Sequence, residues 1–173
     1  MNNILGLVFA ILLGGAGLVV LLALVEELFP GFVGRSASLA EEQHGRAVLL
    51  GFLNSLLLLV LASVLMIIGE RIFSPLFALM AGAIAILLTI GFLFGLSAMG
   101  SLIGRIIKPS TEGWSQLLWG NGAMLLACLG PYLGWFLFLP YVLFRGLGGV
   151  VMAQSAKRRE RRALKEAEEE EHA

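Results

Sequence analysis

Residues 113–153 read GWSQLLWGNGAMLLACLGPYLGWFLFLPYVLFRGLGGVVMA, and Arg145 is the only charged residue among these 41. An α-helix rises 1.5 Å per residue, so a single helix of this length would extend ~60 Å. That is about twice the ~30 Å hydrocarbon core of a membrane. The stretch is therefore too long for one simple membrane span.

A turn signal lies in the middle of this stretch: Gly130-Pro131-Tyr132-Leu133-Gly134-Trp135. Pro and Gly break helices, and Tyr and Trp are enriched where a span meets the membrane interface. We therefore expect two helices, residues 114–129 and 132–153. Gly130, Pro131 and Gly134 would form a tight hairpin turn between them. The alternative is one long, kinked helix.

Three further stretches contain no Asp, Glu, Lys or Arg: residues 4–25, 47–69 and 72–104. Each can cross a bilayer, for which about 20 apolar residues suffice. Hydrophobic residues make up 58% of the chain and the mean hydropathy is +0.92, which agrees. The predicted fold is all-α, a polytopic transmembrane helix bundle with four or five spans.

The expected domain organisation is a transmembrane domain, residues 1–153, followed by a charged tail, residues 154–173. The first segment has no basic residue before it and no small-residue cleavage site, so we expect it to be retained as a span. The five expected spans cover residues 4–28, 47–69, 75–104, 114–129 and 132–153.

The distribution of Lys and Arg favours five spans over four. With five, ten basic residues lie on the cytoplasmic side: Arg35, Arg46, Arg105, Lys108 and the six of the tail. Only Arg71 is then outside. With four spans, seven basic residues lie inside and four outside. Because Lys and Arg concentrate in cytoplasmic loops, we expect a multi-pass protein of a bacterial inner membrane, with the amino terminus outside and the carboxyl terminus in the cytoplasm.

The loop after the first span has helical periodicity. Pro30 is favoured at a helix start, and Phe32, Val33, Ala37 and Ala40 follow at helical spacing. Arg35, Ser38, Glu41 and Glu42 fall towards the other side. This pattern predicts an interfacial amphipathic helix over about residues 31–44. The alternative is a plain polar loop.

Small residues on two spans predict close helix packing. In lipid, notches of glycine allow neighbouring backbones to approach. The expected packing positions are Gly14, Gly17, Gly91, Gly95, Gly100 and Gly104.

A few polar residues interrupt the apolar spans. Asn54 and Asn121 are expected to link helices by hydrogen bonds, although two amides could also line a solute path. Arg145 lies about 12 Å inside its expected span. It should pair with Glu26 or Glu27, or extend to the lipid headgroups.

Residues that carry chemistry are scarce. The chain has no Asp, one cysteine (Cys128), and two histidines, His44 and His172, outside the expected spans. Axial ligation of a haem by histidine is therefore excluded within the spans. The hydroxyl residues in the spans have no His or Lys beside them for activation. We expect no catalytic, metal or cofactor site, and no enzyme.

The tail predicts contact with lipids and with protein. Its basic residues Lys157, Arg158, Arg159, Arg161 and Arg162 suit anionic headgroups. The acidic run 168–171 would project into water, where it could contact a cytoplasmic protein. No nucleic-acid partner is expected.

Several short motifs resemble one family. Leu28-Phe29-Pro30, Gly45-Arg46-Ala47-Val48, the Gly130–Gly134 hairpin and Gly146-Leu147-Gly148-Gly149 are similar to motifs of small bacterial membrane proteins associated with bactofilin-type polymer-forming cytoskeletal proteins. The family's usual Ile-Gly-Ile-Pro is here Ile68-Gly69-Glu70-Arg71. The resemblance implies a membrane anchor or scaffold. The expected function is a non-catalytic accessory subunit that packs with other integral membrane subunits; the alternative is a small transporter or channel component.

Overall fold

A computed structural model describes residues 2–72, 75–110, 113–130 and 132–171, without side-chain detail at 2–4, 70–72, 165 and 167–171. These residues form six α-helices and one short π-helix, with no β-strand among them. The elements are α1 (Asn2–Leu28), α2 (Pro30–Glu42), α3 (His44–Ile72), α4 (Pro75–Ile107), α5 (Trp114–Cys128), η1 (Gly134–Phe138) and α6 (Leu139–Glu171).

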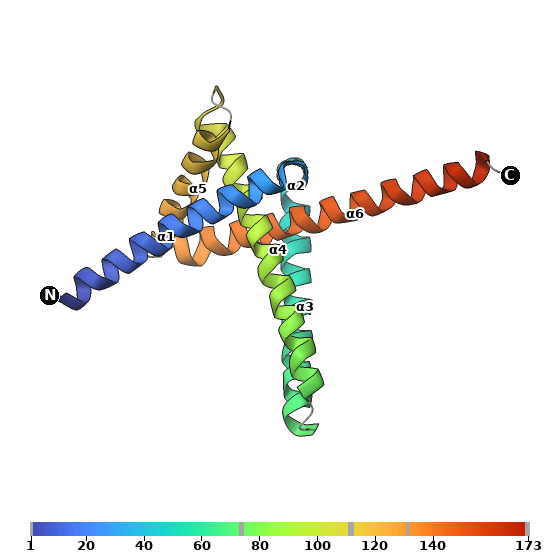
Figure 1. The fold of residues 1–173 in the computed structure, drawn as a ribbon, viewed down its shortest axis with the longest axis horizontal. Coiled ribbons are helices and arrows are strands. Elements are labelled where there is room, and N and C mark those ends of the chain that lie inside the picture. Colours follow the sequence, from blue (N-terminus) through green and yellow to red (C-terminus); the bar gives the residue numbers. More distant parts are fainter. Residues whose placement is uncertain (1, 73–74, 111–112, 131, 172–173) are drawn as a thin grey trace.

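The helices radiate from a common crossing instead of lying side by side in a parallel bundle (Figure 1). The amino-terminal part of α1 and the carboxyl-terminal part of α6 leave the crossing on opposite sides. The far end of α3 and the beginning of α4 form an antiparallel arm at a steep angle to both. We refer to this two-helix segment, residues 54–72 and 75–91, as the arm.

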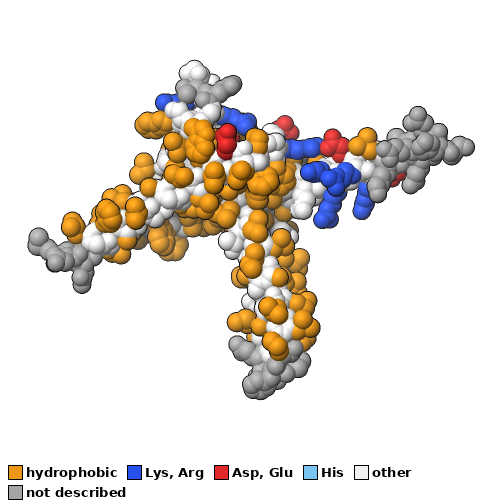
Figure 2. Space-filling model, viewed as in Figure 1, with side chains coloured by type: hydrophobic (Ala, Val, Ile, Leu, Met, Phe, Trp, Pro, Cys, Tyr) orange, Lys and Arg blue, Asp and Glu red, His pale blue; other side chains and the backbone are white. Residues whose placement is uncertain are grey.

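Four helices are long and apolar enough to cross a membrane: Leu5–Leu28, His44–Gly69, Pro75–Ile107 and Gly134–Leu164, counted over the described residues. Apolar side chains cover the outside of α1 and of the arm (Figure 2). A water-exposed surface of this kind would be unstable. The fold fits the expected multi-pass membrane protein.

The long apolar stretch is divided into two helices, as its length requires. Here α5 ends at Cys128 and η1 begins at Gly134. However, α5 packs along α4 and α1. It does not lie beside α6 as one helix of the expected hairpin would. At 15 residues it is ~22 Å long, shorter than a membrane core. The close backbone contacts between α4 and α5, described below, account for this choice of neighbour.

A π-helical turn, for which the sequence pattern holds no local signal, precedes α6. Leu139 donates its backbone N–H to the carbonyl of Gly134, five residues earlier. Pro140 follows directly, and a proline inside a helix has no N–H and crowds the carbonyl four residues before it. The π-helical turn is wider than an α-helical turn and leaves room for the carbonyl four residues before Pro140. The proline therefore remains inside a continuous helical segment.

A helix, α2, covers most of the range expected for the amphipathic helix; on its expected apolar face Val33, Ala37 and Ala40 are buried and Phe32 is half-buried. That face packs against α4 and α6. It is therefore covered by protein, and it is not the surface on which the helix could rest on a bilayer.

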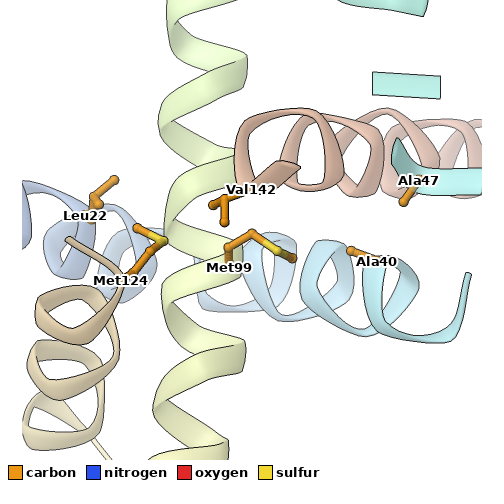
Figure 3. Close-up of a cluster of buried hydrophobic side chains, with 6 residues drawn as sticks. All are labelled: Leu22, Ala40, Ala47, Met99, Met124 and Val142. Carbon is orange, nitrogen blue, oxygen red and sulfur yellow. The ribbon is translucent and has the colours of Figure 1, made fainter. Parts of the chain in front are cut away.

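One cluster of buried side chains lies where the helices cross (Figure 3). Its members come one from each α-helix: Leu22, Ala40, Ala47, Met99, Met124 and Val142. The core is thus small, and it depends on every helix at once.

Candidate functional site: the glycine crossing of α6 and its polar neighbours

Three glycines of α6 bring its backbone against three other helices. A Cβ atom added to Gly146 would collide with the backbone of Gly95 on α4. One on Gly148 would collide with the carbonyl of Ala47 on α3, and one on Gly149 with Ser36 on α2. We call Gly146, Gly148 and Gly149 the glycine crossing. Only glycine permits backbones to approach this closely.

The predicted packing glycines of α4 divide between two neighbours. Gly91 and Gly95 face Leu147 and Gly146 of α6. Gly100 faces the Asn121 side chain of α5, and Gly104 faces the Gln116 backbone of the same helix. The two GxxxG pairs of one helix therefore serve two different contacts.

The predicted packing glycines of α1 have no such neighbours. Within 4 Å of a Cβ added to Gly14 or Gly17 there is no atom of the described chain. In contrast, Gly15 faces Leu125 of α5. One side of α1 is held by α5, while the notch at Gly14 and Gly17 remains open.

Arg145 lies beside the glycine crossing and is 9% exposed. Its Nε donates a hydrogen bond of 3.2 Å to the Ala40 carbonyl, and its Nη1 donates one of 3.0 Å to the Tyr141 hydroxyl. Ala40 belongs to the last turn of α2, where carbonyls lack helical partners and the helix dipole attracts a cation. Arg145 therefore caps α2.

The expected pairing of Arg145 with Glu26 or Glu27 is not formed in the described structure. Glu26 is buried where α1 meets α4, with Ser101 and Arg105 as its polar neighbours, and Glu27 is exposed. The end of α2, which lies against α6, offers Arg145 the Ala40 carbonyl instead of a carboxylate. No residue type in the sequence signals this backbone acceptor.

Polar groups are also buried between α1, α4 and α5. Ser97 Oγ donates to the Leu22 carbonyl at 2.9 Å, joining α4 to α1. Asn121 is fully buried, and neither of its amide atoms has a hydrogen-bond partner among the described residues. Glu26 Oε2 also lacks one there. In a single chain, these unpaired groups are energetically unfavourable.

Asn54 and Asn121 are not brought together. Asn54 lies on α3 beside a groove lined by α4 and α6, whereas Asn121 lies on α5 against Gly100 of α4. Of the predicted turn residues, Gly134 is buried against the carbonyls of Ala127 and Cys128, and Gly130 has ordinary contacts. Pro131 lies outside the described residues.

The basic residues of the tail lie on α6, which continues unbroken from the apolar region (Figure 2). All five are exposed: Lys157, Arg158, Arg159, Arg161 and Arg162. Glu160, in their midst, accepts hydrogen bonds of 3.1 Å from both terminal nitrogens of Arg35 on α2. This ion pair, which was not expected from the sequence, ties the tail to α2.

No group of three or more His, Cys, Asp or Glu that could hold a metal ion occurs among the residues searched, which are the described ones. Comparison with family models, with curated proteins and with solved structures finds no match to this chain. What the protein does must therefore be argued from its geometry.

Proposed function

We propose that this chain is a non-catalytic scaffold subunit whose radiating helices pack with other integral membrane proteins. The observation that carries the proposal is the open notch on α1. Gly14 and Gly17 have the small size that admits a second backbone, yet nothing in the described chain fills the space. In lipid, such a notch is typical of a helix–helix contact.

The radiating arrangement supports the same function. Only 11% of the residues in the apolar windows of α1 and α3, and 6% of those in α4, are buried inside the chain. The helices therefore offer most of their surface to lipid or to other subunits.

We place the protein in a bacterial inner membrane, with the amino terminus outside and the tail in the cytoplasm. This orientation needs an odd number of crossings, so α5 would be a short fifth span beside the four long helices. The excess of Lys and Arg in the segments that are then cytoplasmic supports it. The exposed basic residues of α6 would then meet anionic headgroups, and the acidic end would be free to contact a cytoplasmic protein. The family resemblance described above points to a similar anchoring role and stays a prediction.

The transporter alternative requires Asn54 and Asn121 to line one polar path. The two residues lie at different helix contacts, so this geometry favours the scaffold.

The test is co-purification from the native membrane in mild detergent. The variant Gly14→Leu/Gly17→Leu should fold normally, because both positions are open, but should lose the integral membrane partners. Leu13→Ile, on an exposed neighbouring side chain, is the matched control and should retain them. Retention of all partners by the double glycine variant would contradict the proposal.

A further inference from the structure

A groove with a volume of about 470 Å³ lies between α2, α3, α4 and α6. Most of its lining residues come from the arm and from the carboxyl-terminal part of α6, two segments that meet at a steep angle in Figure 1. Its volume is within the range of ~300–1,000 Å³ typical of ligand sites. We call it the corner groove.

Apart from Asn54 on α3, the walls of the corner groove on the arm side are apolar. Leu58 on α3 and Leu87, Ile90 and Phe94 on α4 line it. Gly91 also lines the groove, where a Cβ added to it would be in ordinary van der Waals contact with Leu147 of α6, 3.5 Å away. A flexible hydrocarbon chain would fit against this surface.

The α6 wall changes from apolar to charged along its length. Leu147, Val150, Gln154 and Arg158 lie on one stripe of the helix and all line the groove. From Leu147 to Arg158 the helix rises ~16 Å. The groove is thus apolar along the arm and cationic where it opens towards the tail.

We propose that the corner groove binds one anionic phospholipid, with an acyl chain along the arm and the phosphate at Arg158 and Gln154. Such a lipid has the same polarity gradient as the groove, and the guanidinium of Arg158 complements its negative headgroup. This inference rests on the membrane location proposed above. It does not require the scaffold function, and it assigns Arg158 a role that its neighbours in the tail do not share.

The test uses the purified full-length chain in detergent, titrated with dioleoyl phosphatidylglycerol or dioleoyl phosphatidylcholine and followed by native mass spectrometry. The wild-type chain should hold one phosphatidylglycerol molecule more tightly than phosphatidylcholine. Arg158→Glu should weaken phosphatidylglycerol binding at least about fivefold, because one basic residue contributes roughly that factor near an anionic surface.

Arg161→Glu is the matched control for charge, because Arg161 is equally cationic but does not line the groove. It should leave the tight binding unchanged. An equal loss of phosphatidylglycerol affinity in Arg158→Glu and Arg161→Glu would overturn the proposal, because it would show that only the net charge of the tail matters.

A second pair of variants tests the acyl chain. Ile90→Trp should fill the groove and weaken both lipids, while Leu79→Trp, exposed on the same helix and outside the groove, should not. Unchanged binding in Ile90→Trp would overturn the proposal. Melting temperatures of all variants identify any that misfold. The co-purification test of the scaffold uses α1 variants, so the two ideas fail separately.

Discussion

Arg145 on α6 donates a 3.2 Å hydrogen bond to the backbone carbonyl of Ala40 on α2, across 105 residues of sequence. The same guanidinium donates to Tyr141, one turn earlier on α6, and its central carbon lies 5.6 Å from the centre of that ring. A buried cation is therefore satisfied by a helix end and a hydroxyl, without a carboxylate. The carboxyl-terminal end of α2 is therefore stabilised by the side chain of Arg145, which lies 105 residues further along the chain.

Arg145→Leu should lower the free energy of unfolding by about 1–3 kcal/mol, because it leaves the Ala40 carbonyl without this donor. The melting temperature in detergent should then fall by about 2–4 °C per kcal/mol. Tyr141→Phe removes only the hydroxyl contact and should have a smaller effect. A wild-type melting temperature in Arg145→Leu would show that the cap is not stabilising.

Gly148→Ala should destabilise the fold by about 1–3 kcal/mol, because the added methyl group collides with the Ala47 backbone. Gly82→Ala is the control. Gly82 is also helical, but no atom lies near its added Cβ, so the substitution should be neutral or slightly stabilising. The melting temperature should therefore fall in Gly148→Ala and stay the same or rise slightly in Gly82→Ala. Equal changes in melting temperature would argue against the close contact between Gly148 and Ala47.

Asn121→Leu should raise the melting temperature of the isolated chain. The amide is fully buried and unpaired, and Leu replaces it with an apolar group of similar shape. The expected gain is about 1 kcal/mol. Destabilisation of the isolated chain would indicate a hydrogen-bond partner for the amide within it.

Arg35→Cys/Glu160→Cys should be joined by a short bifunctional maleimide, in a background where Cys128 is replaced by Ala; the two long side chains meet only at their tips, so a linker and not a direct disulfide bond spans the gap. The side chains of Arg35 and Glu160 meet at 3.1 Å, so the two helices are close there. By contrast, Glu160→Gln should change stability by less than about 1 kcal/mol, since both residues are substantially exposed. Absence of cross-linking, with Arg35→Cys/Arg162→Cys as the comparison, would show that the tail is not docked on α2.

Cysteine labelling from outside the cell tests the orientation. Asn3→Cys and Glu170→Cys would each be placed in the same Cys128→Ala background. We expect an impermeant maleimide to label position 3 only. Protection of both positions would support four crossings with both termini inside, and labelling of position 170 would contradict the proposed cytoplasmic tail.

The helices are well predicted from the sequence because long uncharged runs and helical periodicity are local signals. The spacing of Val33, Ala37 and Ala40 alone predicts the apolar face of α2, and all three side chains are buried. Their spacing could not show that α4 and α6 would cover this face, because an apolar stripe does not identify its partner. The division of the long apolar stretch follows from its length, but the π-helical turn depends on how Pro140 is accommodated.

The site was less predictable, because its interactions join distant segments. Gly91, Gly95, Gly100 and Gly104 indicated close packing, yet GxxxG spacing does not say which helix fills each notch. Arg145 was identified by its charge in an apolar stretch, but its acceptor is a main-chain carbonyl, which any residue type provides. The Arg35–Glu160 pair likewise joins two regions that are far apart in the chain and carry no shared motif.

The glycine crossing has a consequence for how the protein is made. Because α6 supplies the common contact for α2, α3 and α4 and is made after them, these earlier helices enter the membrane before the element that joins them is available. Chains truncated before Gly146 would keep every preceding helix, yet would lack the central contact and would be exposed to membrane proteases. The contacts that join α2, α3 and α4 can therefore form only once α6 has been made.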